Sequence, residues 1–328
     1  MRGCETGRSI FSHSILIAAA GAISVYAQSA DVVRRSIPAP SAGRLTLTAE
    51  SGGSIDVSRG SPGAIGVEVR FGGYLSSQGD IERMRRDFQL DIDKQGSDVR
   101  IEGRFRTLHN GWSLWSLFDG GFLTRVEYRV TLPPQTATAR FETSGGSIAV
   151  GDLKGDIQAQ TSGGSLHFGR IDGMVAGNTS GGSISLENSR GKAVLHTSGG
   201  SIHIAETGGD VDATTSGGGI GIDRAGGRIY AHTSGGGITV GEALNAVDAS
   251  TSGGGIRIGL AAGKGFDLDA STSGGGVSCE FPLSGPGERN RKEIRGAVQG
   301  GGPLVRLHTS GGGIGILHAR SGGLASAN

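Results

Sequence analysis

Apolar residues recur along this chain at a fixed spacing of 18 residues. Position 0 of each repeat is the threonine that opens a near-copy of TSGGSI; positions 5 and 7 are then apolar, and position 6 varies freely. This alternation is typical of a short β-strand with one buried face. Seven threonines open such repeats: Thr143, Thr161, Thr179, Thr197, Thr215, Thr233 and Thr251.

A second short strand is predicted later in each repeat. Positions 14 and 16 hold small or β-branched apolar residues, as at Val211 and Ala213. By the same parity, the threonine at position 0 points inward and the residue before it points outward. That outward column reads Glu142, Gln160, Asn178, His196, Thr214, His232 and Ser250.

Two strands in 18 residues leave room for two turns. One contains the Gly-Gly pair that follows Thr-Ser, and the other centres on position 12. Asparagine is the residue after glycine that best tolerates positive φ, so the single asparagine at position 12 predicts a left-handed backbone there in every repeat. The predicted structural turn residues are Gly155, Gly173, Gly191, Gly209, Gly227, Asn245 and Gly263.

One repeat alone cannot enclose a hydrophobic core, but stacked repeats can, with strands about 4.8 Å apart. The predicted fold is therefore all-β: a parallel β-helix, or β-solenoid, with 18-residue coils of two short strands each. Alanine and glycine at position 16 predict a thin core. The inward threonine and serine columns are expected to form hydrogen-bonded ladders at the corner.

The flanking segments predict the domain organisation. Residues 1–27 combine a basic start with a short apolar run and indicate an export signal cleaved after Ala27; a membrane anchor is the alternative, although the run is shorter than the roughly 20 residues that a span needs. Residues 31–140 are expected to be a β-rich N-terminal part that caps the solenoid. Residues 141–318 are the predicted solenoid, and residues 319–328 a flexible tail.

The repeat also appears outside the regular series. An early echo lies at Ser51–Ile55, and later copies begin at Thr272 and Thr309. A polar, basic segment at about residues 282–303 separates these two copies and is predicted to be an exposed excursion from the solenoid. In the N-terminal part, a helical or turn segment is expected before two alternating strands, Phe88–Asp93 and Asp98–Phe105.

These segments together resemble a known family. The stretch VEYRVTLPPQTATARFETSGGSIAVGDLKGDIQAQTSGGSL and the closing GGGPLVRLHTSGGGIGIL are similar to the bacterial putative adhesin domain. The resemblance covers about residues 40–318. It implies an exported β-solenoid of the bacterial envelope that acts in adhesion or in sensing envelope stress.

Composition narrows the class of protein further. The chain has 328 residues, of which 64 are glycine and 8 are proline, and a net charge of +1. Collagen needs far more proline, and disorder needs high net charge with low hydrophobicity. Loss of the signal removes two arginines and one glutamate, which leaves a net charge of zero and no general attraction to nucleic acid.

Cys279 is then the single cysteine, and its sequence context favours a strand residue over a nucleophile.

Residues for chemistry are sparse. His196 and His232 share a column two coils apart, about 9.6 Å, which is too far for both to bind one Zn²⁺. His167 and His203 repeat that spacing, and a mixed site with a neighbouring column stays open. No catalytic residue, metal or cofactor is therefore predicted. The coil carboxylates are scattered along the chain: Asp152, Asp156, Asp172, Asp210, Asp212 and Asp223.

The segment NGWSLWSLFDGGF is the most suggestive binding feature. It contains both tryptophans, Trp112 and Trp115, together with Phe118 and Phe122. These aromatic residues either cover the apolar end of the first coil or form a loop that docks a sugar, a membrane surface or a partner protein.

The sequence thus favours a non-enzymatic, exported interaction scaffold. Its partner is expected to be an envelope protein or a glycan, bound on the outward columns or on the aromatic loop. Two alternatives are a carbohydrate-active enzyme on a β-helix, which needs clustered carboxylates across neighbouring coils, and a component of an envelope-stress sensor.

Overall fold

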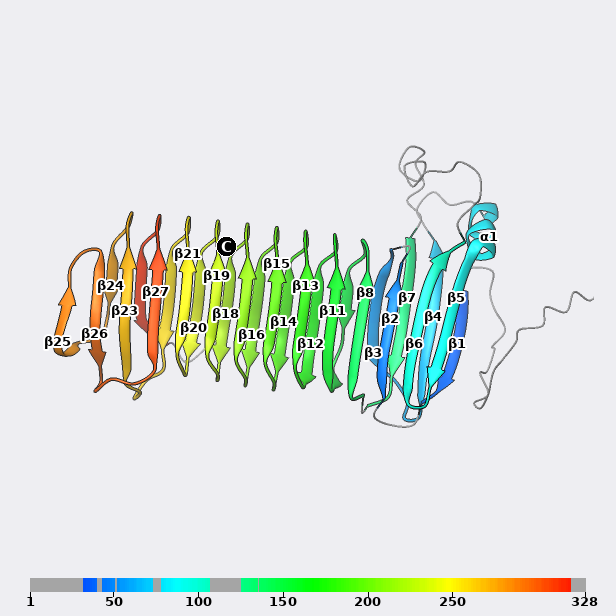
Figure 1. Ribbon diagram of the computed structural model, residues 1–328, viewed down its shortest axis with the longest axis horizontal. Helices are drawn as coiled ribbons and strands as arrows, with labels where there is room; N and C mark the ends of the chain where they lie inside the picture. Colours follow the sequence, from blue (N-terminus) through cyan, green and yellow to red (C-terminus); the bar gives the residue numbers. More distant parts are fainter. Residues whose placement is uncertain are drawn as a thin grey trace, which may run out of the picture.

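The chain forms an elongated solenoid in which two long β-sheets face each other (Figure 1). The computed structural model describes residues 32–319, except 40–42, 51, 73–77, 107–124 and 135. Most neighbouring strands in both sheets are parallel. This confirms the predicted all-β solenoid. The proposed signal, residues 1–27, and the tail beyond Ala319 lie outside the described residues.

Sheet A carries the first strand of each coil. Its spatial order is β1 (Val32–Pro38), β4 (Ala64–Gly72), β7 (Arg125–Leu132), β3 (Ser54–Arg59), β9 (Ile148–Val150), β12 (Leu166–Asp172), β14 (Ile184–Ser189), β16 (Ile202–Thr207), β18 (Ile220–Ala225), β20 (Ile238–Ala243), β22 (Ile256–Leu260), β28 (Ile314–His318) and β24 (Val277–Cys279), with β10 (Leu153–Lys154) beside β12.

Sheet B carries the second strand of each coil. Its spatial order is β25 (Leu283–Arg289), β26 (Glu293–Val298), β23 (Phe266–Thr272), β27 (Leu304–Thr309), β21 (Val247–Thr251), β19 (Ile229–Thr233), β17 (Val211–Thr215), β15 (Ala193–Thr197), β13 (Val175–Thr179), β11 (Asp156–Thr161), β8 (Thr138–Thr143), β2 (Arg44–Ala49), β6 (Asp98–Phe105) and β5 (Phe88–Gln95).

The core is a thin apolar layer between the two sheets. Sheet A contributes positions 5 and 7, such as Ile202 and Ile204, and sheet B contributes positions 14 and 16, such as Val211 and Ala213; all four side chains are at most 2% exposed. The threonines at position 0 are buried in the same layer, as their parity predicts. Small residues at position 16 let the two sheets approach each other.

The buried threonine hydroxyls form a ladder along the solenoid. Thr197 Oγ1 donates to the carbonyl of Gly182 in the preceding coil at 2.7 Å and accepts from the backbone N–H of Gly200 in its own coil at 3.3 Å. The same donation recurs at Thr143, Thr161, Thr179, Thr215, Thr233, Thr251, Thr309 and Thr272. The predicted threonine ladder is present, and each of its bonds joins a side chain to the backbone.

Glycine at position 3 is required by the close stacking of the turns. A Cβ built on Gly164 would lie 2.1 Å from the carbonyl oxygen of Gly146, and one on Gly182 would lie 2.1 Å from that of Gly164. The neighbouring glycine at position 2 is less restricted, since a Cβ on Gly163 would make an ordinary contact of 3.5 Å. In this motif the preceding coil therefore approaches position 3 far more closely than position 2.

The left-handed backbone predicted at position 12 is wrong for most repeats. Only Gly155 (φ 120°) and Gly263 (φ 74°) of the seven residues have positive φ. The four other glycines are restricted by stacking: for example, a Cβ on Gly209 would lie 2.6 Å from the carbonyl carbon of Gly191, and one on Gly227 would lie 2.5 Å from that of Gly209. Asn245 has neither a positive φ nor this restriction, since it already carries a Cβ. All seven residues lie in the bends between the two strands of a coil.

The N-terminal part adds a coil level that precedes the regular series. Strand β2 pairs with β8 and β3 pairs with β9, both parallel, and Thr143 donates to the carbonyl of Gly53. The early echo of the motif is therefore a coil. Strands β6 and β7 stack on its outer side, so β2 and β3 have neighbours on both sides. The expected helix and two strands are present as α1 (Gln78–Asp87), β5 and β6.

The C-terminal end does not follow the order of the sequence. The last coil, β27–β28, lies between β21–β22 and the earlier coil β23–β24 (Figure 1). The segment predicted to be an exposed excursion is mostly exposed among its described residues, and it forms an antiparallel hairpin, β25–β26, whose second strand pairs with β23 and extends sheet B. This pairing satisfies the hydrogen bonds of the β23 edge.

We expect Gly164→Ala to destabilise the protein and Gly163→Ala to be nearly neutral. At Gly164 the added methyl group overlaps the backbone of the preceding coil, and overpacking of this kind costs about 1–3 kcal/mol. Urea unfolding followed by circular dichroism measures both variants. Equal losses at the two positions would contradict the assignment of the close approach to position 3.

The threonine ladder gives a second stability prediction. Thr197→Val keeps the shape of the side chain but removes the hydroxyl, which leaves the Gly182 carbonyl without its donor; the expected cost is about 1–3 kcal/mol. Thr197→Ser keeps the hydroxyl and should lose less. Thermal unfolding of the two variants tests this order, and a valine variant as stable as the serine variant would show that the hydroxyl does not matter.

Candidate functional site

The outer face of sheet B presents two parallel columns of side chains. They come from positions 15 and 17, which point away from the core, and strand register aligns them across the coils. The first column reads Arg140, Gln158, Ala176, Val194, Asp212, Tyr230, Asp248, Arg306 and Asp269. The second reads Glu142, Gln160, Asn178, His196, Thr214, His232, Ser250, His308 and Ser271.

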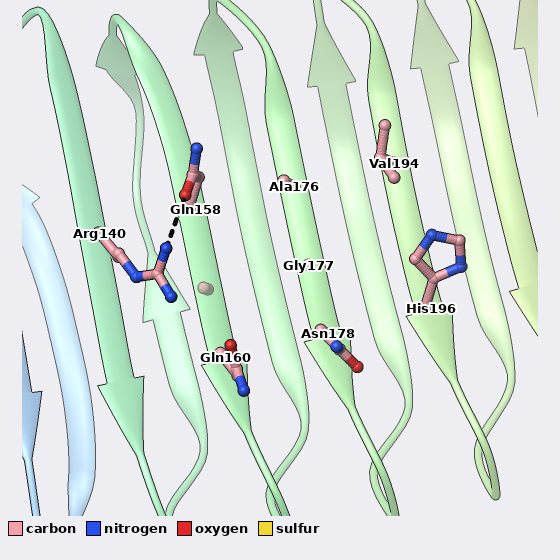
Figure 2. Close-up of a pocket in the computed structure, with 9 residues that line it drawn as sticks. Arg140, Gln158, Gln160, Ala176, Gly177, Asn178, Val194 and His196 are labelled. Atoms are coloured by element: carbon pink, nitrogen blue, oxygen red, sulfur yellow. Dashed lines mark hydrogen bonds between the residues drawn. The ribbon is translucent and has the colours of Figure 1, made fainter.

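One end of this face has a shallow depression of about 130 Å³ (Figure 2). Its floor is Ala176 and the backbone of Gly177, because these residues carry little or no side chain. Gly177 is small for an internal reason: a Cβ there would lie 3.0 Å from the ring of Phe168 and 3.1 Å from Leu195 in the core. The hollow itself comes from Ala176, whose short outward side chain lies between Gln158 and Val194 in the first column. The rim consists of Arg140, Gln158, Gln160, Asn178, Val194 and His196.

Three polar side chains of the rim are free to bind. Among the described residues, Gln160, Asn178 and His196 have no side-chain hydrogen bond or ion pair within the protein, and Figure 2 shows them on three successive strands. Arg140 differs, since its guanidinium pairs with Glu142 and approaches Gln158 Oε1 at 3.4 Å. Planar donors and acceptors on rigid strands are well suited to hydrogen-bond a polar ligand.

A second cluster lies farther along the same face, around Tyr230. Its side chain is 47% exposed and its ring lies 3.8 Å from the His232 ring, centroid to centroid. In the first column the two neighbours of Tyr230 are Asp212 and Asp248, one on each side. Asp248 lies 3.6 Å from Arg306, whereas Asp212 has no ion pair among the described residues. We call these residues the Tyr230 cluster.

His232 is held in the neutral form. Burial lowers its pKa, and the charges of Asp248 and Asp212 oppose this only in part. Its Nδ1 hydrogen-bonds to Ser250 Oγ. Its Nε2 is 3.9 Å from Asp248 Oδ1, which is too long for a hydrogen bond, so that nitrogen is buried without a hydrogen-bond partner. The imidazole of His232 therefore gives the Tyr230 ring an uncharged surface to pack against.

Because β27 lies between β21 and β23, histidines and hydroxyl side chains alternate along the second column. This alternation is not visible in the order of the sequence. In space the second column runs His196, Thr214, His232, Ser250, His308 and Ser271, so that a hydroxyl separates each histidine from the next. His308 Nδ1 and Ser271 Oγ are 3.1 Å apart. Neighbouring histidines are two strands apart, as predicted for His196 and His232.

The outer face of sheet A is occupied by its own contacts. Glu206 accepts from Asn188 at 3.2 Å, and Arg224 pairs with Glu206 at 3.3 Å and with Glu242 at 2.9 Å. At a coil bend, Asp152 accepts from the backbone N–H of Arg170 at 2.9 Å, and this bond lowers the pKa of the carboxyl. These side chains stabilise the stacking of the coils.

The predicted aromatic loop stays a prediction. Trp112, Trp115, Phe118 and Phe122 lie outside the described residues. Cys279 ends strand β24 and is buried, and burial raises the pKa of its thiol, in keeping with a strand residue.

The coil histidines have polar neighbours of their own. His167 Nδ1 lies 2.7 Å from Ser185 Oγ, and His203 Nε2 lies 3.7 Å from Asp223. Within the part of the chain that the structure describes, no three histidine, cysteine, aspartate or glutamate side chains come close enough to hold a metal ion.

Two features of the site were missed from sequence. Tyr230 is the only aromatic side chain of the first column, and the repeat numbering places it at outward position 15, so a reading of that column would have found it. The depression depends on the short side chain of Ala176 in the same outward column, so a reading of that column would also have indicated it.

Comparison with solved structures identifies proteins of similar architecture. One is described as a putative adhesin from Bacteroides fragilis (12% identity, 88% of this chain and 98% of that chain covered, TM-score 0.35). Another is described as a putative adhesin from Parabacteroides distasonis (10% identity, 87% of this chain and 97% of that chain covered, TM-score 0.44). A third is described as a putative lipid-binding protein from the same organism (15% identity, 88% of this chain and 97% of that chain covered, TM-score 0.43). Two of these three structures are named putative adhesins, the family that the sequence resembles.

Comparisons by sequence found no match: no protein-family model matches the chain, and no curated protein does. Among the described residues, no helix is long and apolar enough to cross a membrane.

The lowered pKa of His232 gives a pH prediction. The unfolded chain takes up a proton at this histidine near pH 6.5, whereas the folded protein does so only at lower pH; acidification therefore favours unfolding until the folded pKa is reached. Urea midpoints measured from pH 7.5 to 5.5 should fall less in His232→Gln than in the unaltered protein. The same fall in both would show that another group causes the dependence.

Proposed function

We propose that this protein is a non-enzymatic, exported binding scaffold of the adhesin type that holds a glycan on the outer face of sheet B. The observation that supports the proposal most directly is the depression in Figure 2, where Gln160, Asn178 and His196 present hydrogen-bonding groups without protein partners. Sugar hydroxyls are donors and acceptors at once, and they match amide and imidazole groups of this kind.

The surface chemistry favours a glycan over a protein partner. The core of a stable protein interface is rich in aromatic and other apolar side chains. Among the described residues, only Tyr230 and Leu304 are large apolar side chains that are well exposed. A polar face with an isolated aromatic ring is better suited to a hydrated polymer.

The solenoid also supplies rigidity. Gln160, Asn178 and His196 each occupy the same position in consecutive coils, and parallel hydrogen-bonded strands fix the backbone beneath them. Binding therefore needs no rearrangement of the backbone, which favours affinity. Export is supported by the basic start and apolar run of residues 1–27.

The test is a glycan array of bacterial envelope polysaccharides probed with the purified protein. We expect Asn178→Ala combined with His196→Ala to weaken binding roughly tenfold or more, because each lost hydrogen bond leaves a sugar group unpaired. Asn188→Ala is the matched control, since it removes the same side chain from the outer face of sheet A.

Three outcomes would contradict the proposal. Equal binding by the double variant and the control would move recognition away from the depression. Release of reducing ends from a bound polymer would show an enzyme. Absence of binding to every glycan, with specific capture of one purified envelope protein, would make the partner a protein.

A further inference from the structure

The Tyr230 cluster has the features of a separate sugar subsite. Tyr230 is well exposed although it lies in the middle of the sheet, where the other members of its column are polar, charged or small. Its ring packs on neutral His232 at 3.8 Å, and this contact fixes the position of the ring. A rigid, exposed aromatic face is the surface on which the C–H groups of a pyranose ring pack.

Carboxylates flank this ring on both sides. Asp212 precedes Tyr230 and Asp248 follows it in the same column, each one strand away. Asp248 is engaged by Arg306 at 3.6 Å, so Asp212 is the carboxylate without an ion pair in the described chain. A sugar lying over the Tyr230 ring would have its hydroxyls close to the carboxylates of Asp212 and Asp248, which accept hydrogen bonds.

We propose that Tyr230 is the stacking platform for one pyranose unit of a glycan and that Asp212 accepts hydrogen bonds from its hydroxyls. The inference rests on the proposed function, because it names a second contact for the same class of ligand. The subsite lies two strands from His196, so one linear glycan that runs along the sheet reaches both this subsite and the depression.

The local charge narrows the class of sugar. Asp212, Asp248 and Asp269 are acidic, and Arg306 lies between the last two. A uronate would meet the unpaired carboxylate of Asp212 and be repelled. The hydroxyls of a neutral sugar donate hydrogen bonds to the Asp212 carboxylate, and the ammonium group of an amino sugar is attracted to its negative charge. The shared chemistry is a pyranose without a negative charge.

Affinity electrophoresis of the full chain tests the proposal with three polymers: a neutral β-glucan, chitosan and polygalacturonate. We expect the β-glucan or chitosan to retard the protein and polygalacturonate not to do so. Tyr230→Ala should weaken this retardation roughly fivefold or more, while Tyr230→Phe keeps most of it. Asp212→Asn should weaken binding to chitosan more than to the β-glucan.

Leu304→Ala is the matched control, because it removes the other large exposed apolar side chain of the described residues. Circular dichroism confirms that each variant is folded. Retardation that Tyr230→Ala leaves unchanged, or that Leu304→Ala reduces equally, would overturn the proposal, as would stronger retardation by polygalacturonate.

The two proposals fail in different ways. If Asn178→Ala with His196→Ala abolishes retardation while Tyr230→Ala does not, the glycan-binding scaffold stands and the Tyr230 subsite is wrong. If none of the three polymers retards the unaltered protein and no glycan binds on the array, both are wrong.

Discussion

The fold depends on one contact, the hydrogen bond from a buried threonine hydroxyl to a glycine carbonyl in the preceding coil. The threonine side chain is buried between the two sheets, away from water, so its hydroxyl needs a partner within the protein, and the backbone of the preceding coil supplies it. The bond fixes the turn of one coil against the turn of the next. That close approach leaves no space for a Cβ at position 3, which explains why glycine and threonine recur together.

This contact also explains which parts of the structure were predictable. Threonine, glycine and the apolar pairs repeat together, so the period predicted the strands, their buried faces and their stacking correctly. The order of the last coils was not predictable, because Thr272 and Thr309 carry the same motif and either can follow Thr251 in the ladder. The φ angles at position 12 were also missed, since close stacking selects glycine there as strongly as positive φ does.

The candidate site was predictable only in part. The outward column with Gln160, Asn178 and His196 follows from parity alone. Whether such side chains are free of hydrogen bonds within the protein depends on the side chains beside them, and the repeat pattern does not predict those contacts. Asn188 on sheet A donates to a carboxylate, while Asn178 on sheet B has no partner in the described chain. Both sheets use some outward polar groups in contacts across the coils, such as Arg224 with Glu206 on sheet A and Arg140 with Gln158 on sheet B, so composition alone does not show which groups are free.

The position of the last coil has a mechanical consequence. A solenoid whose final coil sits at the end can be peeled, one row of hydrogen bonds at a time, by tension on the chain. Here β27 is bonded to β21 on one side and β23 on the other, and β28 is bonded to β22 and β24 in the same way. Tension on the chain beyond β28 therefore loads two ladders in shear at once. A protein that holds a surface under flow would resist extraction at this end more strongly than a simple stack of coils.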